Sequence, residues 1–288
     1  MARHRRKRSG WGRWTAIFLI LCLAGVFFFR WSNHSLQTAR FAFRSKRLPE
    51  AFDGFVVVQL SDLHGALFGE NNRTLLRRVQ AEKPDAIVLT GDLLDRYRGT
   101  PYSYAVELGG ELAEIAPTYF VTGNHEWAFP NVPELKRGLT AAGVTVLSNE
   151  YAVLERDGAR IVLAGIDDPN GYADQKTPGE LAEEIRAGFG EPFWLLLAHR
   201  NNYFEREYSL LGADLVISGH GHGGLIRLPF TDGLLSVERT LFPSYTAGFY
   251  SANGGEVFVS RGLGNSGPSF RIFNRPEIAV LTLERDTP

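Results

Sequence analysis

The chain of 288 residues carries 31 basic and 32 acidic side chains, so its charge nearly cancels and gives no reason to expect nucleic acid as a partner. Once an N-terminal segment is set aside, its length suits one large α/β domain. The single cysteine, Cys22, lies in an apolar stretch, which excludes disulfides and thiolate metal sites from the remainder of the chain.

The N-terminal residues have the pattern of a membrane anchor. Residues 1–13 are rich in Arg and Lys without any acid, and residues 14–29 carry no charge. We expect a basic segment at 1–13, a transmembrane signal anchor at 14–31 and a juxtamembrane linker at 32–51. A cleaved signal peptide remains the alternative, although no small-residue cleavage site follows the apolar run.

The charges around this span favour a single pass with the main domain on the outer side of the membrane. Further basic residues follow the span and weaken the asymmetry, and they are candidates for contact with anionic headgroups. They are Arg30, Arg40, Arg44, Lys46 and Arg47.

From residue 52 onward, short apolar runs alternate with amphipathic stretches, which is typical of an α/β domain. We expect strands, nearly continuous in apolar residues and so covered on both faces, at 55–60, 86–90, 119–122, 161–166, 193–198 and 215–218. Helices are expected at 71–82, 103–115, 132–142, 178–187 and 203–211.

After Gly221 the chain becomes rich in Gly, Pro and aromatic residues. Strand patterns at 257–260 and 278–283 predict a second sheet packed on the first. The aromatic stretch 242–250 either contacts acyl chains or packs within the domain.

Most of the central strand candidates end on a polar cluster, at the sheet edge where open α/β sheets place their sites. In an extended segment residues i and i+2 project to the same side, so such pairs can aim two groups at one place. A lone histidine after a strand is more often a structural residue, but ligand-type residues at successive strand ends are hard to obtain from packing alone. The candidates are Asp62, His64, Asp92, Asn124, His125, His199, His220 and His222.

Carboxylates, neutral imidazoles and an amide oxygen without sulfur favour Mn, Fe or Zn over Ca. There are too many ligands for one ion. Two divalent metals about 4 Å apart, bridged by a carboxylate, would bind both an attacking hydroxide and the phosphoryl oxygens of a substrate.

This ordered set, together with Gly91, Gly123 and Gly219, resembles the calcineurin-like metallophosphoesterase superfamily over residues 55–222. Residues 260–265 and 275–278 further resemble its bacterial membrane-associated branch. The resemblance implies a four-layer α/β sandwich of two mixed β-sheets flanked by helices, here preceded by one transmembrane helix, and a location in the bacterial inner membrane with the domain on the periplasmic side.

The resemblance also implies roles for individual residues. One metal ion would be held by Asp62, His64 and His222, the other by Asn124, His199 and His220, and Asp92 would bridge the two. Leu225, where a Gln is common, and the residues that follow His199 depart from the branch and put the substrate in doubt rather than the ligands.

Three residues are implied to act on the substrate. His125 would stabilise the transition state or protonate the leaving oxygen, or else only orient a ligand by a hydrogen bond. Asp95 would orient His125, and Arg96 would hold phosphate. Asp95 equally fits a cap of the next segment, and Arg96 a solvated side chain.

The sequence therefore predicts a membrane-anchored, two-metal hydrolase of phosphoesters, acting on a phosphodiester or a lipid-linked phosphate. A pyrophosphatase of the kind that cleaves UDP-2,3-diacylglucosamine in lipid A synthesis is the alternative if the domain faces the cytoplasm. A non-catalytic metal-binding membrane scaffold is a rival that predicts a missing ligand, and no ligand is missing from the sequence.

Overall fold

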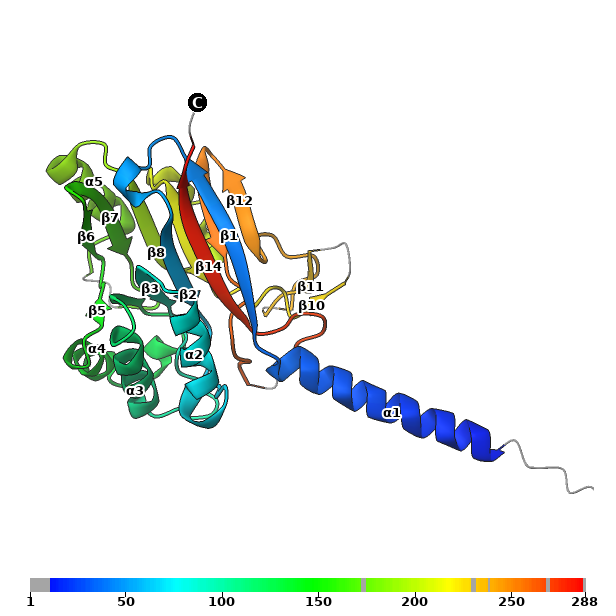
Figure 1. Ribbon diagram of the computed structural model, residues 1–288. Coiled ribbons are helices and arrows are strands. Elements are labelled where there is room, and N and C mark those ends of the chain that lie inside the picture. Colours follow the sequence, from blue (N-terminus) through cyan, green and yellow to red (C-terminus); the bar gives the residue numbers. More distant parts are fainter. Residues whose placement is uncertain (1–10, 172–174, 229–231, 238, 268–269, 287–288) are drawn as a thin grey trace, which may run out of the picture.

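Two sheets packed against each other between helices form the domain in the computed structural model, which describes residues 11–171, 175–228, 232–237, 239–267 and 270–286 (Figure 1). The first sheet has the spatial order β1 (Gln37–Ser45), β14 (Glu277–Arg285), β2 (Phe55–Leu60), β3 (Ala86–Thr90), β4 (Thr118–Val121) and β5 (Thr145–Val146). The second has the order β12 (Gly248–Ala252), β13 (Gly255–Val259), β9 (Leu215–Gly219), β8 (Trp194–Arg200), β7 (Ala159–Gly165) and β6 (Glu150–Arg156).

Both sheets are mixed. In the first, β14 runs antiparallel to β2 and the other neighbours are parallel. In the second, the outer pairs β12–β13 and β6–β7 are antiparallel, whereas β13, β9, β8 and β7 are parallel. The predicted fold is confirmed, and the central strands are divided between the two sheets.

Three apolar cores hold the layers together. One lies between the first sheet and the helices α2 (Arg73–Ala81), α3 (Tyr102–Ala113) and α4 (Val132–Ala141). The second lies between the two sheets, where Val88 and Val121 face Leu195 and Ile217. The third lies between the second sheet and α5 (Pro178–Phe189). The order is therefore helices, sheet, sheet, helix, which accounts for the strands being apolar on both faces.

The helix ends follow from local sequence. Thr177 and Glu180 form a reciprocal capping box at the start of α5, and Pro178 occupies its first turn. The side chain of Asn131 caps α4 by accepting from the backbone N–H of Glu134. These side chains satisfy backbone donors that would otherwise lack partners, so both helices begin where the sequence predicts.

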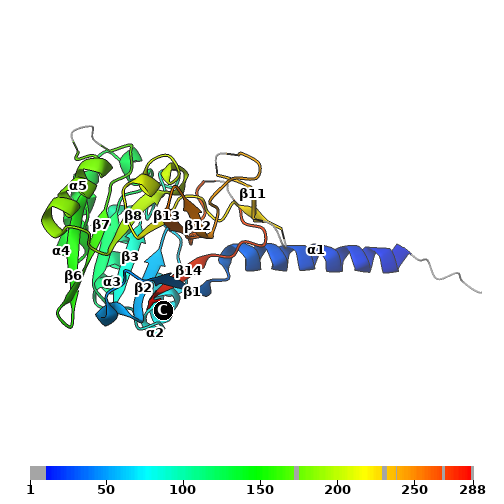
Figure 2. The ribbon, with the colours of Figure 1, turned by 90° about the horizontal axis from the view of Figure 1, so that it is seen from above.

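The N-terminal helix α1 (Trp11–His34) extends away from the domain (Figures 1 and 2). Its 24 residues are predominantly apolar, and the helix is long enough to cross a membrane by length and composition. At 1.5 Å per residue it spans about 36 Å, somewhat more than the hydrocarbon thickness of a bilayer. It includes Arg13 and continues past the predicted end at residue 31; the basic residues 3–8 lie outside the described part of the chain.

The segment 32–51, which the sequence led us to assign to a linker, contains a strand of the first sheet. β1 pairs in parallel with β14 along its whole length, and Phe43 is buried between the sheets. Its other face bears charges that pair with the domain: Arg40 with Glu82 at 2.6 Å and Arg44 with Glu284 at 2.8 Å. These charges gave the segment the composition of a linker; the expected contact of the basic residues with headgroups stays a prediction.

The helix expected at 203–211 is wrong. The chain there makes two short 3₁₀ turns, Asn201–Tyr203 and Tyr208–Leu210, and Glu207 between them departs from helical geometry, with φ −139° and ψ −65°. Both Phe204 and Tyr208 are nevertheless buried against the second sheet. The spacing of apolar residues correctly indicated which side chains are buried, but it did not predict the backbone conformation.

Candidate metal centre

The predicted ligands converge where the carboxyl ends of strands from both sheets meet. Asp62 and His64 follow β2, Asp92 follows β3, and Asn124 with His125 follow β4, all in the first sheet. The second sheet contributes a residue within β8 and two that follow β9: His199, His220 and His222. Parallel neighbouring strands bring these ends together.

Most of these ligand residues sit in unusual backbone conformations. A positive φ of this kind is uncommon for non-glycine residues and concentrates at functional sites. It is found at Asp62, His64, Asp92, His220 and His222, with φ between 48° and 64°. Gly91, with φ +87°, is required by space as well, because a Cβ there would lie 2.5 Å from the backbone nitrogen of Gly123 and 2.8 Å from Nδ1 of His199.

The first cluster consists of Asp62, His64 and His222, all buried. Nε2 of His64 lies 3.1 Å from Nε2 of His222, which in turn lies 3.5 Å from Oδ1 of Asp62. Two imidazole nitrogens aimed at each other beside a carboxylate are the donor set of a divalent transition metal.

The second cluster consists of Asp92, His199 and His220, with Asn124 beside it. Nε2 of His199 lies 3.2 Å from Nδ1 of His220, 3.2 Å from Oδ1 of Asn124 and 3.3 Å from Oδ2 of Asp92. The same Oδ2 lies 3.7 Å from Nε2 of His64 in the first cluster. Asp92 therefore faces both clusters with one oxygen.

The charges in this centre favour cations. Burial lowers the pKa of His64 and of His222, which keeps them in the neutral form that binds metals. Although burial acts against it, the carboxylate of Asp92 raises the pKa of His199 to about 10. The carboxylate that stabilises a proton on His199 would also stabilise a metal cation, and the donor set fits divalent metal ions.

Glu126 holds the two loops that carry Asp92 and Asn124. One carboxylate oxygen accepts the backbone N–H groups of Asp92 at 2.8 Å and Gly123 at 2.7 Å, and the other accepts that of Leu94 at 3.0 Å. Burial, followed by the charge of Asp92, raises the pKa of Glu126 to about 7. Sequence reasoning assigned this residue no role, because it binds backbone groups that a motif does not display.

His125 lies at the edge of the first cluster, its ring centroid 4.5 Å from that of His64. The backbone N–H of Arg96 donates to Nδ1 of His125 at 3.2 Å, so a neutral ring carries its proton on Nε2. That nitrogen lies 3.2 Å from Oγ of Ser266. Burial lowers the pKa of His125 to about 4.

Asp95 lies close to His125, and the guanidinium of Arg96 lies elsewhere. Oδ1 of Asp95 is 3.6 Å from Nδ1 of His125, which agrees with a role in orienting that ring. The same oxygen accepts the backbone N–H of Tyr97 at 2.9 Å, which agrees with a cap of the next segment. The exposed side chain of Arg96 donates to the hydroxyl of Tyr97 at 2.5 Å and stacks over its ring. The structure brings only the backbone of Arg96 to the site.

Sequence reasoning missed Arg271, which is fully buried behind the first cluster. Its Nη2 lies 3.3 Å from Nδ1 of His222 and donates to the carbonyl of Gly264 at 2.7 Å. Its backbone N–H donates to Oδ1 of Asn33 at 2.8 Å, at the end of α1. Arg271 thus connects the N-terminal helix to a predicted ligand, and a buried arginine far along the chain gives no periodic signal by which to find it.

Asp167 and Asp168, two acids near the site, serve structural pairs. Oδ2 of Asp167 accepts from Nζ of Lys136 at 2.5 Å, and the carboxylate of Asp168 takes two bonds from Arg200, at 2.7 and 3.2 Å. Neither acid belongs to the metal-ligand clusters found among the described residues.

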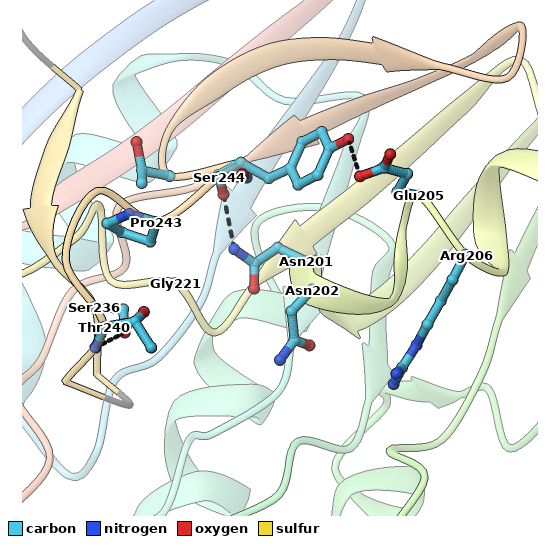
Figure 3. A pocket seen from close by; sticks show the side chains of 11 residues that line it. Asn201, Asn202, Glu205, Arg206, Gly221, Ser236, Thr240, Pro243 and Ser244 are labelled. Atoms are coloured by element: carbon cyan, nitrogen blue, oxygen red, sulfur yellow. Dashed lines mark hydrogen bonds between the residues drawn. The ribbon is translucent and has the colours of Figure 1, made fainter.

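A cavity of about 600 Å³ adjoins the centre at Gly221, between His220 and His222 (Figure 3). Asn201 and Glu205 line one side and the loop with Ser236 and Thr240 lines the other. None of the candidate ligands is among the residues that line the cavity. A Cβ at residue 221 would lie 2.6 Å from Nδ2 of Asn201, so a side chain there would displace the Asn201 amide.

The family model described as calcineurin-like phosphoesterase matches residues 55–224, more than half of the chain. The chain belongs to the calcineurin-like phosphoesterase family. Members are metal-dependent hydrolases of phosphoesters with a dinuclear metal centre, and the paired clusters of this phosphoesterase agree with that.

Relatives of this phosphoesterase occur in bacteria and animals. The uncharacterized metallophosphoesterase YkuE of Bacillus subtilis is 31% identical over 265 residues, covering 87% of this chain and 86% of that protein. An uncharacterized metallophosphoesterase of Aquifex aeolicus is 27% identical, covering 88% and 93%. A Bos taurus protein named transmembrane protein with metallophosphoesterase domain is 32% identical over 83% of this chain, which spans 55% of that relative.

Proposed function

We propose that this phosphoesterase is anchored by α1 and hydrolyses phosphodiesters or lipid-linked phosphates with two divalent ions. The observation that carries the proposal is the position of Asp92, whose Oδ2 lies 3.7 Å from His64 in one cluster and 3.3 Å from His199 in the other. One carboxylate oxygen that faces two donor clusters suits a bridge between two cations.

The ligand assignment follows the clusters. Asp62, His64 and His222 would hold one ion, Asn124, His199 and His220 the other, and Asp92 would bridge them. The donors are oxygen and imidazole nitrogen, for which Mn, Fe and Zn are the suitable metals. When bound, the two cations supply activated water and neutralise the charge that develops on the phosphoryl oxygens.

His125 is proposed to donate a hydrogen bond from Nε2–H to the leaving oxygen, which stabilises the charge on that oxygen while the ring keeps its proton. Nδ1 already accepts from the backbone of Arg96, so the N–H points from the opposite side of the ring. Oγ of Ser266 lies 3.2 Å from Nε2, on the side where the leaving oxygen would bind, so substrate would displace Ser266 from this contact. Asp95 is proposed to position His125; Arg96 reaches phosphate only if its side chain leaves Tyr97.

One ester group of the substrate is proposed to occupy the cavity beside Gly221 (Figure 3). The cavity begins between two ligand histidines, so a phosphate at the metals would direct its ester group there. Asn201 ties the two walls by donating to the carbonyl of Tyr245 at 2.7 Å, and the hydroxyl of Tyr245 donates to Glu205 at 2.9 Å. A cavity of this volume accommodates a drug-sized group.

The reaction class is tested with the full chain in detergent, using bis-p-nitrophenyl phosphate and p-nitrophenyl phosphate with added Mn. Metal-dependent hydrolysis that is lost in Asp92→Asn and in His125→Ala would support the site, and the ratio of the two substrates separates diesterase from monoesterase. Asp157→Asn, an exposed turn residue with φ +49°, is the matched control. A folded, metal-loaded protein whose Asp92→Asn variant keeps full activity would overturn the proposal.

We further propose that the anchor lies in a bacterial inner membrane with the domain on the periplasmic side, because the sequence before α1 is more basic than the sequence that follows it. A periplasm-dependent reporter fused after Pro288 should be active. Activity confined to a cytoplasmic reporter would reverse the orientation.

A further inference from the structure

A small sheet lies on the side of the domain from which α1 leaves (Figure 2). Its strands β10 (Ile226–Arg227) and β11 (Gly233–Leu235) pair with each other. On one side Ile226 bridges to Ile272, and on the other Leu235 bridges to Leu241. The segments around residues 272 and 241 therefore flank this sheet.

These flanking segments expose large apolar side chains, which we name the apolar rim: Leu241, Phe242, Phe270 and Phe273. Their exposed fractions are 67%, 73%, 41% and 48%. By contrast, Phe249 and Tyr250 at the end of the same aromatic stretch pack on Phe258 and Tyr245. Groups of exposed apolar side chains on one surface mark an interaction site.

The apolar rim is continuous with α1. The rings of Phe28 and Phe273 lie 4.8 Å apart between centroids, and those of Phe29 and Phe270 lie 6.3 Å apart. None of the membrane-length window of α1 is buried in the structure, so its apolar surface also needs a cover. Because these rings are in contact, a surface that covers the end of α1 also covers the apolar rim.

Backbone strain accompanies this exposure. Phe242 has φ +52° and Phe273 has φ +51°, a region in which a bulky side chain is an outlier. Such conformations persist where the surrounding structure imposes them and are a reason to look for function. Here both strained residues present an aromatic ring outward.

The rim is also joined to the metal centre through one chain segment. The backbone N–H of Gly264 donates to the carbonyl of Asp62 at 2.6 Å, and Ser266 lies 3.2 Å from His125. A few residues later the same segment carries Phe270 and Phe273. A membrane surface that binds the apolar rim would therefore lie near the metal centre.

We infer that the apolar rim rests in the interfacial region of the bilayer that holds α1, and that the substrate is a phosphoester whose apolar part stays in that bilayer. The second half of this statement rests on the proposed function. A phosphate at headgroup depth would then reach the metal centre without leaving the membrane.

Insertion is tested with the full chain in lipid nanodiscs, in a Cys22→Ser background, with an environment-sensitive fluorophore on Phe242→Cys. Lipids with a spin label at the depth reached by interfacial side chains, about 5–10 Å, should quench it. Leu210→Cys is the matched control, because Leu210 is 63% exposed but precedes the amino end of β9, whereas the candidate ligands His220 and His222 follow its carboxyl end. Quenching at 242 no stronger than at 210 overturns the inference. Unlabelled Phe242→Cys protein that forms a disulfide-linked dimer with an added mild oxidant, while the labelled protein shows no quenching, also overturns it and would identify a second copy as the occupant.

A second measurement addresses the substrate. The paired change Leu241→Ser and Phe242→Ser should raise KM for a phospholipid phosphoester in nanodiscs and leave hydrolysis of bis-p-nitrophenyl phosphate unchanged. An unchanged KM for the lipid overturns the substrate half. Quenching does not require turnover, so an enzyme with a quenched rim that is inactive on every phosphoester supports the surface and counts against the proposed function alone.

Discussion

Replacing Glu126 with Gln tests whether its carboxylate fixes the metal-binding loops. In the wild type two backbone N–H groups, from Asp92 and Gly123, share one oxygen and that of Leu94 uses the other. A glutamine can keep the first two on its carbonyl, but its NH₂ group then faces the N–H of Leu94. One buried donor loses its acceptor and, at a pH above the Glu126 pKa of about 7, the remaining two lose a charged partner.

We expect this to cost about 2–4 kcal/mol, since an unsatisfied buried donor costs roughly 1–3 kcal/mol and bonds to charged groups are stronger than neutral ones. For a domain of this size the melting temperature should fall by about 5–15 °C. Metal affinity should fall about 10–100-fold, as for other groups that hold ligands in place.

Thermal unfolding of the metal-free protein measures the first effect, and calorimetric titration with Mn measures the second. Glu111→Gln, on the exposed face of α3, is the control and should match the wild type. If Glu126→Gln keeps both the wild-type melting temperature and the wild-type metal affinity, the carboxylate does not hold these loops and the reasoning fails.

Three further outcomes are expected. Chelation should abolish hydrolysis and lower the melting temperature. If the metal had been at a hundredfold excess over its Kd, the loss of stability is about 2.7 kcal/mol. Elemental analysis should find close to two ions per chain, and one ion or none in folded protein contradicts the paired centre. Asn33→Ala removes the bonds to the backbone of Arg271 at 2.8 and 3.0 Å and should lower stability by about 1–3 kcal/mol, measured by denaturant unfolding; wild-type stability would show that the junction contributes nothing. A chain starting at residue 35 should fold and one starting at 52 should not, because the latter lacks Phe43, whose loss alone removes about 3–5 kcal/mol of core packing; circular dichroism of both decides it.

The convergence of the candidate metal ligands could be predicted because the information for it is local. Strand ends followed by ligand residues at i and i+2 place groups such as Asp62 and His64 together without knowledge of the whole fold. β2 and β3 match their predicted bounds because fully buried strands give unbroken apolar runs.

The remainder depends on contacts that no local pattern contains. β1 was hidden by the arginines on one of its faces, and only its distant partner β14 makes it a strand. Glu126 and Arg271 act on backbone groups, so their residue types alone say nothing of their partners. The aromatic stretch 242–250 was left open between two interpretations, and the structure divides it, with Phe242 exposed and Phe249 packed.

The pairing of β1 with β14 also determines the order in which the chain is able to fold. Gln37 and Glu277 are partners in this ladder and lie 240 residues apart. β14 separates β1 from β2, so during synthesis the strand next to α1 has no neighbour until nearly the whole domain has been made. Long-range pairing of this kind slows folding and leaves an open strand edge meanwhile. A nascent chain held at a membrane by α1 would therefore carry an aggregation-prone edge beside the lipid surface until β14 arrives and closes the sheet.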